Sequence, residues 1–216
     1  RSLYGNKFAA KLFYQVVRKA LTTSKEQGGP GFTVSQYDHC LFIRDDCIAI
    51  NWVDDAIFIS KDPTVAESVV KQLKQNGYNL HIELVDGGQR DYLGIDYKKM
   101  PDGKSLMCTQ TGLIDRIIKA TGLQNANPTN TPIVNPLGKC PDSPRFSGPF
   151  NHRSVVGMLI YLYNTTRPDI GYAVTSCAHF SHDPKAKHGT AIKRIVCYLK
   201  KTKNVGLVIH PSKSNI

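Results

Sequence analysis

Residues 51–60 read NWVDDAIFIS, a β-forming apolar stretch that is interrupted at its centre by Asp54 and Asp55. The apolar, β-branched and aromatic residues on both sides predict two strands of a hairpin with the aspartates at its tip. An aspartate carboxylate accepts hydrogen bonds from nearby backbone N–H groups, so a plain turn is one interpretation of the pair. A functional site is the other, and the flanking residues bear on the choice.

The flanks of this pair differ from those of Asp45-Asp46, which follows Arg44 and is typical of an ordinary charged hairpin turn. Two adjacent carboxylates beside apolar residues repel each other and resist desolvation, and a divalent cation removes that cost. Mg²⁺ binds one or two carboxylates together with water and substrate phosphates. The pair therefore indicates a site for Mg²⁺ or Mn²⁺ that supports two-metal nucleotidyl transfer.

The remaining pattern predicts an α+β protein, in which a sheet is followed by an all-helical end. Apolar periodicity predicts helices at 3–22, 63–76 and 109–123 and three helical pieces between 151 and 201. Short β-type runs predict strands at 32–37, 40–44, 47–53, 56–60, 78–84, 90–99, 105–109 and 205–210. Residues 124–149 are rich in Pro, Asn, Gly and Ser and are expected to form an irregular connector.

The composition fits a folded and basic protein. Hydrophobic residues make up 41% of the 216 residues, which is enough for a core and excludes a disordered chain. The net charge of +11 favours polyanionic partners such as nucleic acid or an anionic membrane surface, and a merely basic soluble domain explains it equally well. Because no apolar run is long enough to span a bilayer, we expect no membrane-spanning segment.

The six cysteines are scattered and include no CxxC pair, so we expect reduced thiols in an intracellular protein. The segment 177–188 brings Cys177, His179, His182 and His188 close together in sequence. A metal site there is conceivable, but Pro184 separates the last histidine from the others. Unrelated polar residues around a helix–helix turn are the simpler interpretation.

Several motifs together resemble the reverse transcriptases of copia-type LTR retrotransposons. W-V-D-D resembles the Y-V-D-D motif of that family, with Trp52 in place of Tyr. Four further blocks resemble family motifs and keep the family order: SLYGNKFAAKLFY (2–14), YLGIDY (92–97), HRSVVGMLIYLYNTTRPDIGYAV (152–174) and KHGTAIKRIVCYLKKTKNVGL (187–207). The resemblance implies an RNA-directed DNA polymerase that copies element RNA into DNA, with a right-hand polymerase fold.

The resemblance also implies a domain arrangement and partners. Residues 1–100 would be the C-terminal part of the palm, 101–150 a hairpin, short helix and connector, and 151–216 a helical thumb leading toward a ribonuclease H domain. The implied partners are an RNA template, a DNA primer, deoxynucleoside triphosphates and the remainder of the Pol polyprotein. The implied location is a cytoplasmic virus-like particle, or the nucleus.

Residue roles follow from the resemblance, position by position. Asp54 and Asp55 match the catalytic, metal-binding carboxylates, with Asp54 as the more direct ligand. Nucleotide binding is implied for Tyr4, Gly5 and Lys7, and primer binding for Trp52, Tyr92, Leu93 and Gly94. Nucleic-acid binding is expected for Arg153, Gly157, Tyr161, Lys193, Arg194, Lys200 and Lys201.

The chain departs from the family at Asn6, Phe8, Ala10 and Trp52. The family also uses an aspartate upstream of the 2–14 block, so we expect a fragment that is inactive alone. A non-catalytic remnant that binds nucleic acid, or a decayed element without function, are the alternatives. At Gly157, tight helix packing is the alternative to a surface that contacts nucleic acid.

Overall fold

The computed structural model describes residues 8–53, 55–78 and 90–210. The chain divides into two compact units, Arg1–Asp86 and Gly87–Ile216, here called the N-terminal and C-terminal units. The division into palm, connector and thumb at residues 100 and 150 stays a prediction. Residues 96–99 belong with the C-terminal unit because they pair with residues 106–109.

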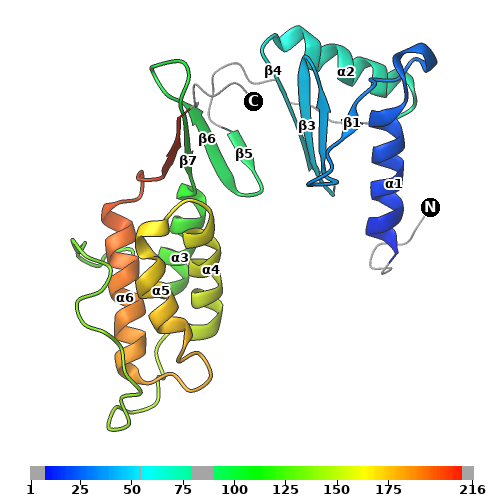
Figure 1. Ribbon diagram of the computed structural model, residues 1–216. Coiled ribbons are helices and arrows are strands. Elements are labelled where there is room, and N and C mark those ends of the chain that lie inside the picture. Colours follow the sequence, from blue (N-terminus) through cyan, green and yellow to red (C-terminus); the bar gives the residue numbers. More distant parts are fainter. Residues whose placement is uncertain (1–7, 54, 79–89, 211–216) are drawn as a thin grey trace. The chain divides into compact units, whose positions relative to one another are not determined.

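The N-terminal unit is an antiparallel sheet in the order β1-β2-β3-β4 with two helices (Figure 1). Its strands are β1 (Thr33–Val34), β2 (Leu41–Arg44), β3 (Cys47–Trp52) and β4 (Asp55–Ser60). Its helices are α1 (Ala9–Thr22), the 3₁₀ turn η1 (Lys25–Gln27) and α2 (Pro63–Gln75). Helix α2 begins at Pro63, as the sequence predicted, and Asp62 caps it by accepting a hydrogen bond from the Thr64 amide.

The two faces of this sheet have different environments because side chains alternate along each strand. Phe42, Cys47 and Ala49 lie on the face that forms a core with α1 and α2. On the opposite face, Ile43, Ile48 and Ile59 are direct cross-strand neighbours and are 45%, 39% and 50% exposed. The helices therefore fix the sheet from one side.

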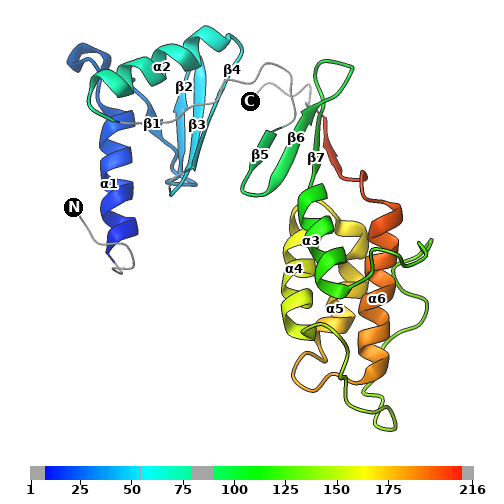
Figure 2. The ribbon, with the colours of Figure 1, turned by 180° about the vertical axis from the view of Figure 1, so that it is seen from behind.

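The C-terminal unit contains a second antiparallel sheet, in the order β5-β6-β7-β8. It consists of β5 (Arg90–Tyr92), β6 (Ile95–Lys99), β7 (Leu106–Thr109) and β8 (Leu207–Ile209). The last strand pairs with β7 across a long stretch of chain, with Leu106 opposite Ile209. All the helices of this unit are inserted between those two neighbouring strands, as Figures 1 and 2 show.

The inserted helices are α3 (Thr111–Thr121), α4 (His152–Thr165), the 3₁₀ turn η2 (Pro168–Ile170), α5 (Gly171–Ala178) and α6 (Ala186–Lys201). Their apolar faces form one core, to which Ile114, Leu159, Val174 and Ile192 each contribute a fully buried side chain. The face of α6 that the sequence predicted to be apolar is buried throughout, at His188, Ile192, Ile195, Val196 and Leu199. No described helix is long and apolar enough to cross a membrane.

The order of elements confirms a mixed protein with antiparallel sheets and helices. The connector 124–149 contains no helix or strand, as expected. The run 90–99 was expected as one strand, but it turns at Leu93 and Gly94 and forms the hairpin β5–β6. The predicted strand at 78–84 lies, apart from Tyr78, outside the described residues.

Candidate functional site

Strands β3 and β4 form the hairpin that the sequence predicted, and Trp52 at the end of β3 pairs with Asp55 at the start of β4. Val53 has a φ of 50°, which is a genuine outlier for a β-branched residue. Such strain costs of the order of 1–3 kcal/mol and is concentrated at functional sites. Asp54 itself lies outside the described residues.

The described part of this tip is open to solvent. Trp52 is 59% exposed and Val53 is 49% exposed, and Asp55 is also exposed at the first position of β4. An exposed carboxylate at a hairpin tip has lone pairs that remain free to take a cation, and hard oxygen ligands suit Mg²⁺. The donor type therefore fits the expected metal, although no group of three His, Cys, Asp or Glu side chains gathers within the described residues.

A hollow of about 210 Å³ lies beside the hairpin, between it and α1. Its walls are mostly apolar and carry no charge. Tyr14, on its wall, donates a hydrogen bond to the carbonyl of His39 over 3.1 Å, which fixes α1 to the loop before β2. Sequence reasoning missed this hollow because its walls come from three separate segments, at Ala10, Phe13, Tyr14, Cys40, Asn51, Trp52 and Val53.

The expected nucleotide-binding residues Tyr4, Gly5 and Lys7 lie outside the described residues, immediately before α1. Of the expected primer-binding residues, Tyr92 ends β5 and pairs with Ile95, and Leu93 and Gly94 form the turn of the hairpin β5–β6 in the C-terminal unit. Leu93 and Gly94 have φ values of 56° and 73°. Positive φ at both central residues is typical of the tight turn that matches the twist of a two-residue hairpin.

The three residues expected on one face of α4 do share that face. Arg153, Gly157 and Tyr161 are all exposed, and a Cβ added at Gly157 would meet no atom within 4 Å in the described residues. Tight helix packing is therefore not the reason for a glycine at 157. The hydroxyl of Tyr161 has a partner within the protein, because it donates a hydrogen bond of 2.5 Å to the carbonyl of Leu93.

The expected nucleic-acid-binding cations of α6 mostly contact the connector. Arg194 donates to the Thr131 hydroxyl over 2.8 Å, and Lys201 donates to the Asn130 amide oxygen over 2.5 Å. Lys200 donates to two backbone carbonyls, those of Gln124 and Ala126. These contacts hold the connector along α6, a structural use of charge that the sequence pattern did not reveal. Phosphate contact by these residues and by Lys193 stays a prediction.

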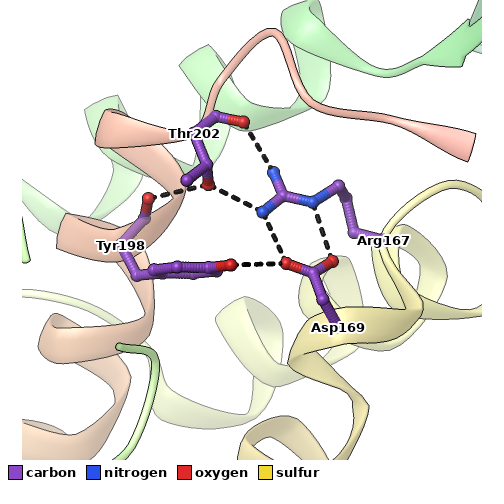
Figure 3. Close-up of polar contacts among 4 residues, drawn as sticks. All are labelled: Arg167, Asp169, Tyr198 and Thr202. Carbon is purple, nitrogen blue, oxygen red and sulfur yellow. Dashed lines mark hydrogen bonds and ion pairs between the residues drawn. The ribbon is translucent and has the colours of Figure 1, made fainter. Parts of the chain in front are cut away.

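A polar cluster around the buried Arg167 joins the segment after α4 to the end of α6 (Figure 3). Arg167 is 1% exposed, and its guanidinium donates to both oxygens of Asp169, over 2.9 and 2.8 Å. It also donates to the carbonyl and hydroxyl of Thr202, while the Tyr198 hydroxyl donates to Asp169. Burial would raise the pKa of Asp169, but the hydrogen bonds from Arg167 and Tyr198 outweigh it and lower the pKa below its ordinary value.

The cysteines and the buried histidine of α6 can be described individually. All six cysteines are free. The ring of His188 is fully buried and accepts a hydrogen bond from the Lys185 amide on Nδ1, and its Nε2 bonds to the carbonyl of Gly138. His188 is thus a satisfied core residue that anchors the connector to α6.

Comparison with known proteins identifies the protein family to which this chain belongs. Residues 1–135 match the family "Reverse transcriptase (RNA-dependent DNA polymerase)", and because this is more than half of the chain, the protein belongs to that family. No solved structure matches the chain.

The relatives carry the assignment further. The chain is 32% identical over 215 residues to the retrovirus-related Pol polyprotein from transposon RE1 of Arabidopsis thaliana, which covers 97% of the chain and 14% of the polyprotein. It is 27% identical over 213 residues to the Pol polyprotein from transposon TNT 1-94 of Nicotiana tabacum, covering 94% of the chain and 15% of that protein. An uncharacterized mitochondrial protein of Arabidopsis thaliana is 32% identical over 76% of the chain and 66% of its own length. The expected resemblance to transposon reverse transcriptases is confirmed.

Proposed function

We propose that this chain is part of a copia-type Pol polyprotein and serves in RNA-directed DNA polymerisation. The observation that carries the proposal is the W-V-D-D hairpin of a reverse transcriptase family member, with an exposed tip and a strained Val53. The proposed substrates are deoxynucleoside triphosphates and a DNA primer on an RNA template. The other parts of the polyprotein are its proposed partners.

In this proposal, Asp54 and Asp55 hold Mg²⁺ or Mn²⁺. A bound metal of this kind stabilises negative charge on the phosphates and lowers the pKa of an attacking hydroxyl. Asp55 begins β4 and pairs with Trp52, so the sheet fixes its backbone. The indole of Trp52 is exposed and offers an apolar surface for the primer terminus.

The same proposal gives the C-terminal unit a role in holding the primer–template. The exposed face with Arg153 and Gly157 lets a polynucleotide backbone approach α4 closely, since Gly157 carries no side chain. The turn at Leu93 and Gly94 would contact the primer strand. Binding of this kind is dominated by phosphate charge and has little sequence preference.

Primer extension by the polyprotein-length enzyme tests the proposal, with Asp54→Asn, Asp55→Asn and the control Asp45→Asn. Asp45 lies in the exposed turn at the opposite end of β3, so its substitution makes the same chemical change away from the proposed site. We expect Asp54→Asn to abolish extension, Asp55→Asn to reduce it strongly and Asp45→Asn to leave it unchanged, with all three melting at the temperature of the wild type.

The interpretation of the pair as a plain turn predicts a different result. Asparagine is also a good turn residue, so both site variants would then extend primers normally. If the wild type binds a primer–template but never extends it, the non-catalytic nucleic-acid-binding alternative is favoured instead.

A further inference from the structure

The contact between Tyr161 and the β5–β6 turn has a consequence for primer positioning. Tyr161 was expected to contact nucleic acid directly, together with Arg153 and Gly157. Its hydroxyl instead donates to the Leu93 carbonyl over 2.5 Å, across 68 positions of the sequence and within the C-terminal unit.

The Leu93 carbonyl lies in the turn, beyond the last pair of the β5–β6 ladder, which joins Tyr92 and Ile95. Leu93 also has a φ of 56°, a conformation that is uncommon for a residue other than glycine. The geometry suits a two-residue hairpin, but a leucine at positive φ costs free energy that the surroundings must offset. The Tyr161 hydroxyl supplies one stabilising contact from a rigid helix.

A second attachment joins the same helix to the same sheet. Gln110 follows β7 directly and is 1% exposed. Its side-chain oxygen accepts hydrogen bonds from the hydroxyls of Thr165, in the last turn of α4, and Thr166, the latter over 2.9 Å. Helix α4 is therefore tied to the sheet at the β5–β6 turn and again after β7, and two separated attachments oppose rotation as well as translation.

We propose that Tyr161 is a positioning residue, which holds the Leu93–Gly94 turn on α4 so that the turn and the exposed α4 face move as one body. This rests on the proposed function, in which the turn and the helix face both contact the primer–template. This positioning role requires one O–H donor at the end of a rigid aromatic ring, within hydrogen-bond distance of the Leu93 carbonyl. Phenylalanine would fill the same space without that donor.

The test compares Tyr161→Phe with Tyr172→Phe, which removes a hydroxyl from an exposed tyrosine of α5. The first measurement is amide hydrogen exchange at residues 93–95 in the 216-residue chain. Tyr161→Phe should speed exchange there about fivefold, the factor expected for one net hydrogen bond, while Tyr172→Phe and the wild type agree. Equal exchange in all three proteins would overturn the proposal.

The second measurement is dissociation of a fluorescent primer–template from the same proteins at low salt. Faster dissociation from Tyr161→Phe alone, with an unchanged melting temperature, supports positioning. Faster exchange with unchanged dissociation would show a purely structural bond and overturn the role. If the wild type binds no primer–template, the proposed function fails, and the positioning role of Tyr161 fails with it. The exchange measurement still decides in that case whether the Tyr161 hydroxyl holds the Leu93–Gly94 turn.

Discussion

A Cβ atom added at Gly189 would lie 2.1 Å from the Cε2 atom of Phe146, closer than any real contact. The ring of Phe146 cannot easily withdraw, because it packs against Phe150 and His152 with centroid distances of 4.9 and 6.0 Å. Glycine in α6 thus makes room for the connector. Gly157 in α4, by contrast, faces open space.

This contrast predicts opposite effects of the same substitution at the two helical glycines. Gly189→Ala should lower the free energy of unfolding by about 1–3 kcal/mol through overpacking. Gly157→Ala should raise it by about 0.5–1 kcal/mol, because alanine has the higher helix propensity. Urea unfolding followed by circular dichroism measures both, and the same sign for both variants would contradict the packing described for Gly189.

The buried guanidinium of Arg167 predicts a large loss of stability on truncation. Arg167→Ala removes the donor to the Thr202 carbonyl and leaves Asp169 with the Tyr198 hydroxyl but without its guanidinium partner, which should cost about 3 kcal/mol. Lys203→Ala is the control, because it breaks the ion pair of Lys203 with the largely exposed Asp115 and should cost less than about 1 kcal/mol. Urea unfolding compares the two, and equal costs would mean that burial does not decide the strength of these pairs.

His152 predicts that the stability of the C-terminal unit depends on pH. This residue is 4% exposed, and its ring nitrogens have no partner among the described residues. Burial lowers the pKa of His152, and His188 lowers it further. Because the pKa of His152 is lower in the folded chain than its ordinary value of 6.5, the unfolded chain takes up the proton first as the pH falls. The contribution of His152 to the free energy of unfolding is therefore complete above pH 6.5 and is lost as the pH falls below that value.

Thermal melting between pH 7.5 and 5 measures this loss, with a slope of at most about 1.4 kcal/mol per pH unit from one group. His152→Phe should flatten the dependence, whereas the same change at the exposed His179 should leave it intact. An equally steep dependence in His152→Phe would assign the effect to other groups.

The contacts of α6 predict that its lysines contribute differently to nucleic-acid binding. Lys193→Ala should reduce the slope of log affinity against log salt by about 0.9 if it neutralises one phosphate. Lys200→Ala should lower the melting temperature instead, because its ammonium holds the carbonyls of Gln124 and Ala126. A primer–template titration at several salt concentrations, run beside thermal melting, separates the two effects. A reduced slope with unchanged melting in Lys200→Ala would contradict the structural role.

Local features of the fold could be predicted because local chemistry determines them. Pro63 after Asp62 specifies the start of α2, and the turn at Asp45-Asp46 joins β2 to β3. The pairing of β7 with β8 could not be read from the chain, since neither strand has a feature that selects the other across the intervening helices.

In the candidate site, too, local features could be predicted and contacts between distant residues could not. The β3–β4 hairpin followed from the apolar residues that flank W-V-D-D, and metal binding there stays a prediction. The family assignment was confirmed by the match of residues 1–135. The partners of Arg167, Gln110 and Lys200 are distant in sequence, so residue type alone did not predict that their polar groups are used inside the protein. Lys200 belongs to a charge pattern that is typical of a solvated surface, so its contacts with the carbonyls of Gln124 and Ala126 were not expected.

The pairing of Leu106 with Ile209 also sets an order for events at the ribosome. Residues 90–109 emerge before the helices, but one edge of β7 stays unpaired until β8 has left the exit tunnel, about a hundred residues later. Loop closure over this length is slow, and a nascent chain with an open strand edge is a target for chaperones and for other unpaired strands. Translation speed through residues 110–205 should therefore influence how much of the protein reaches the native state.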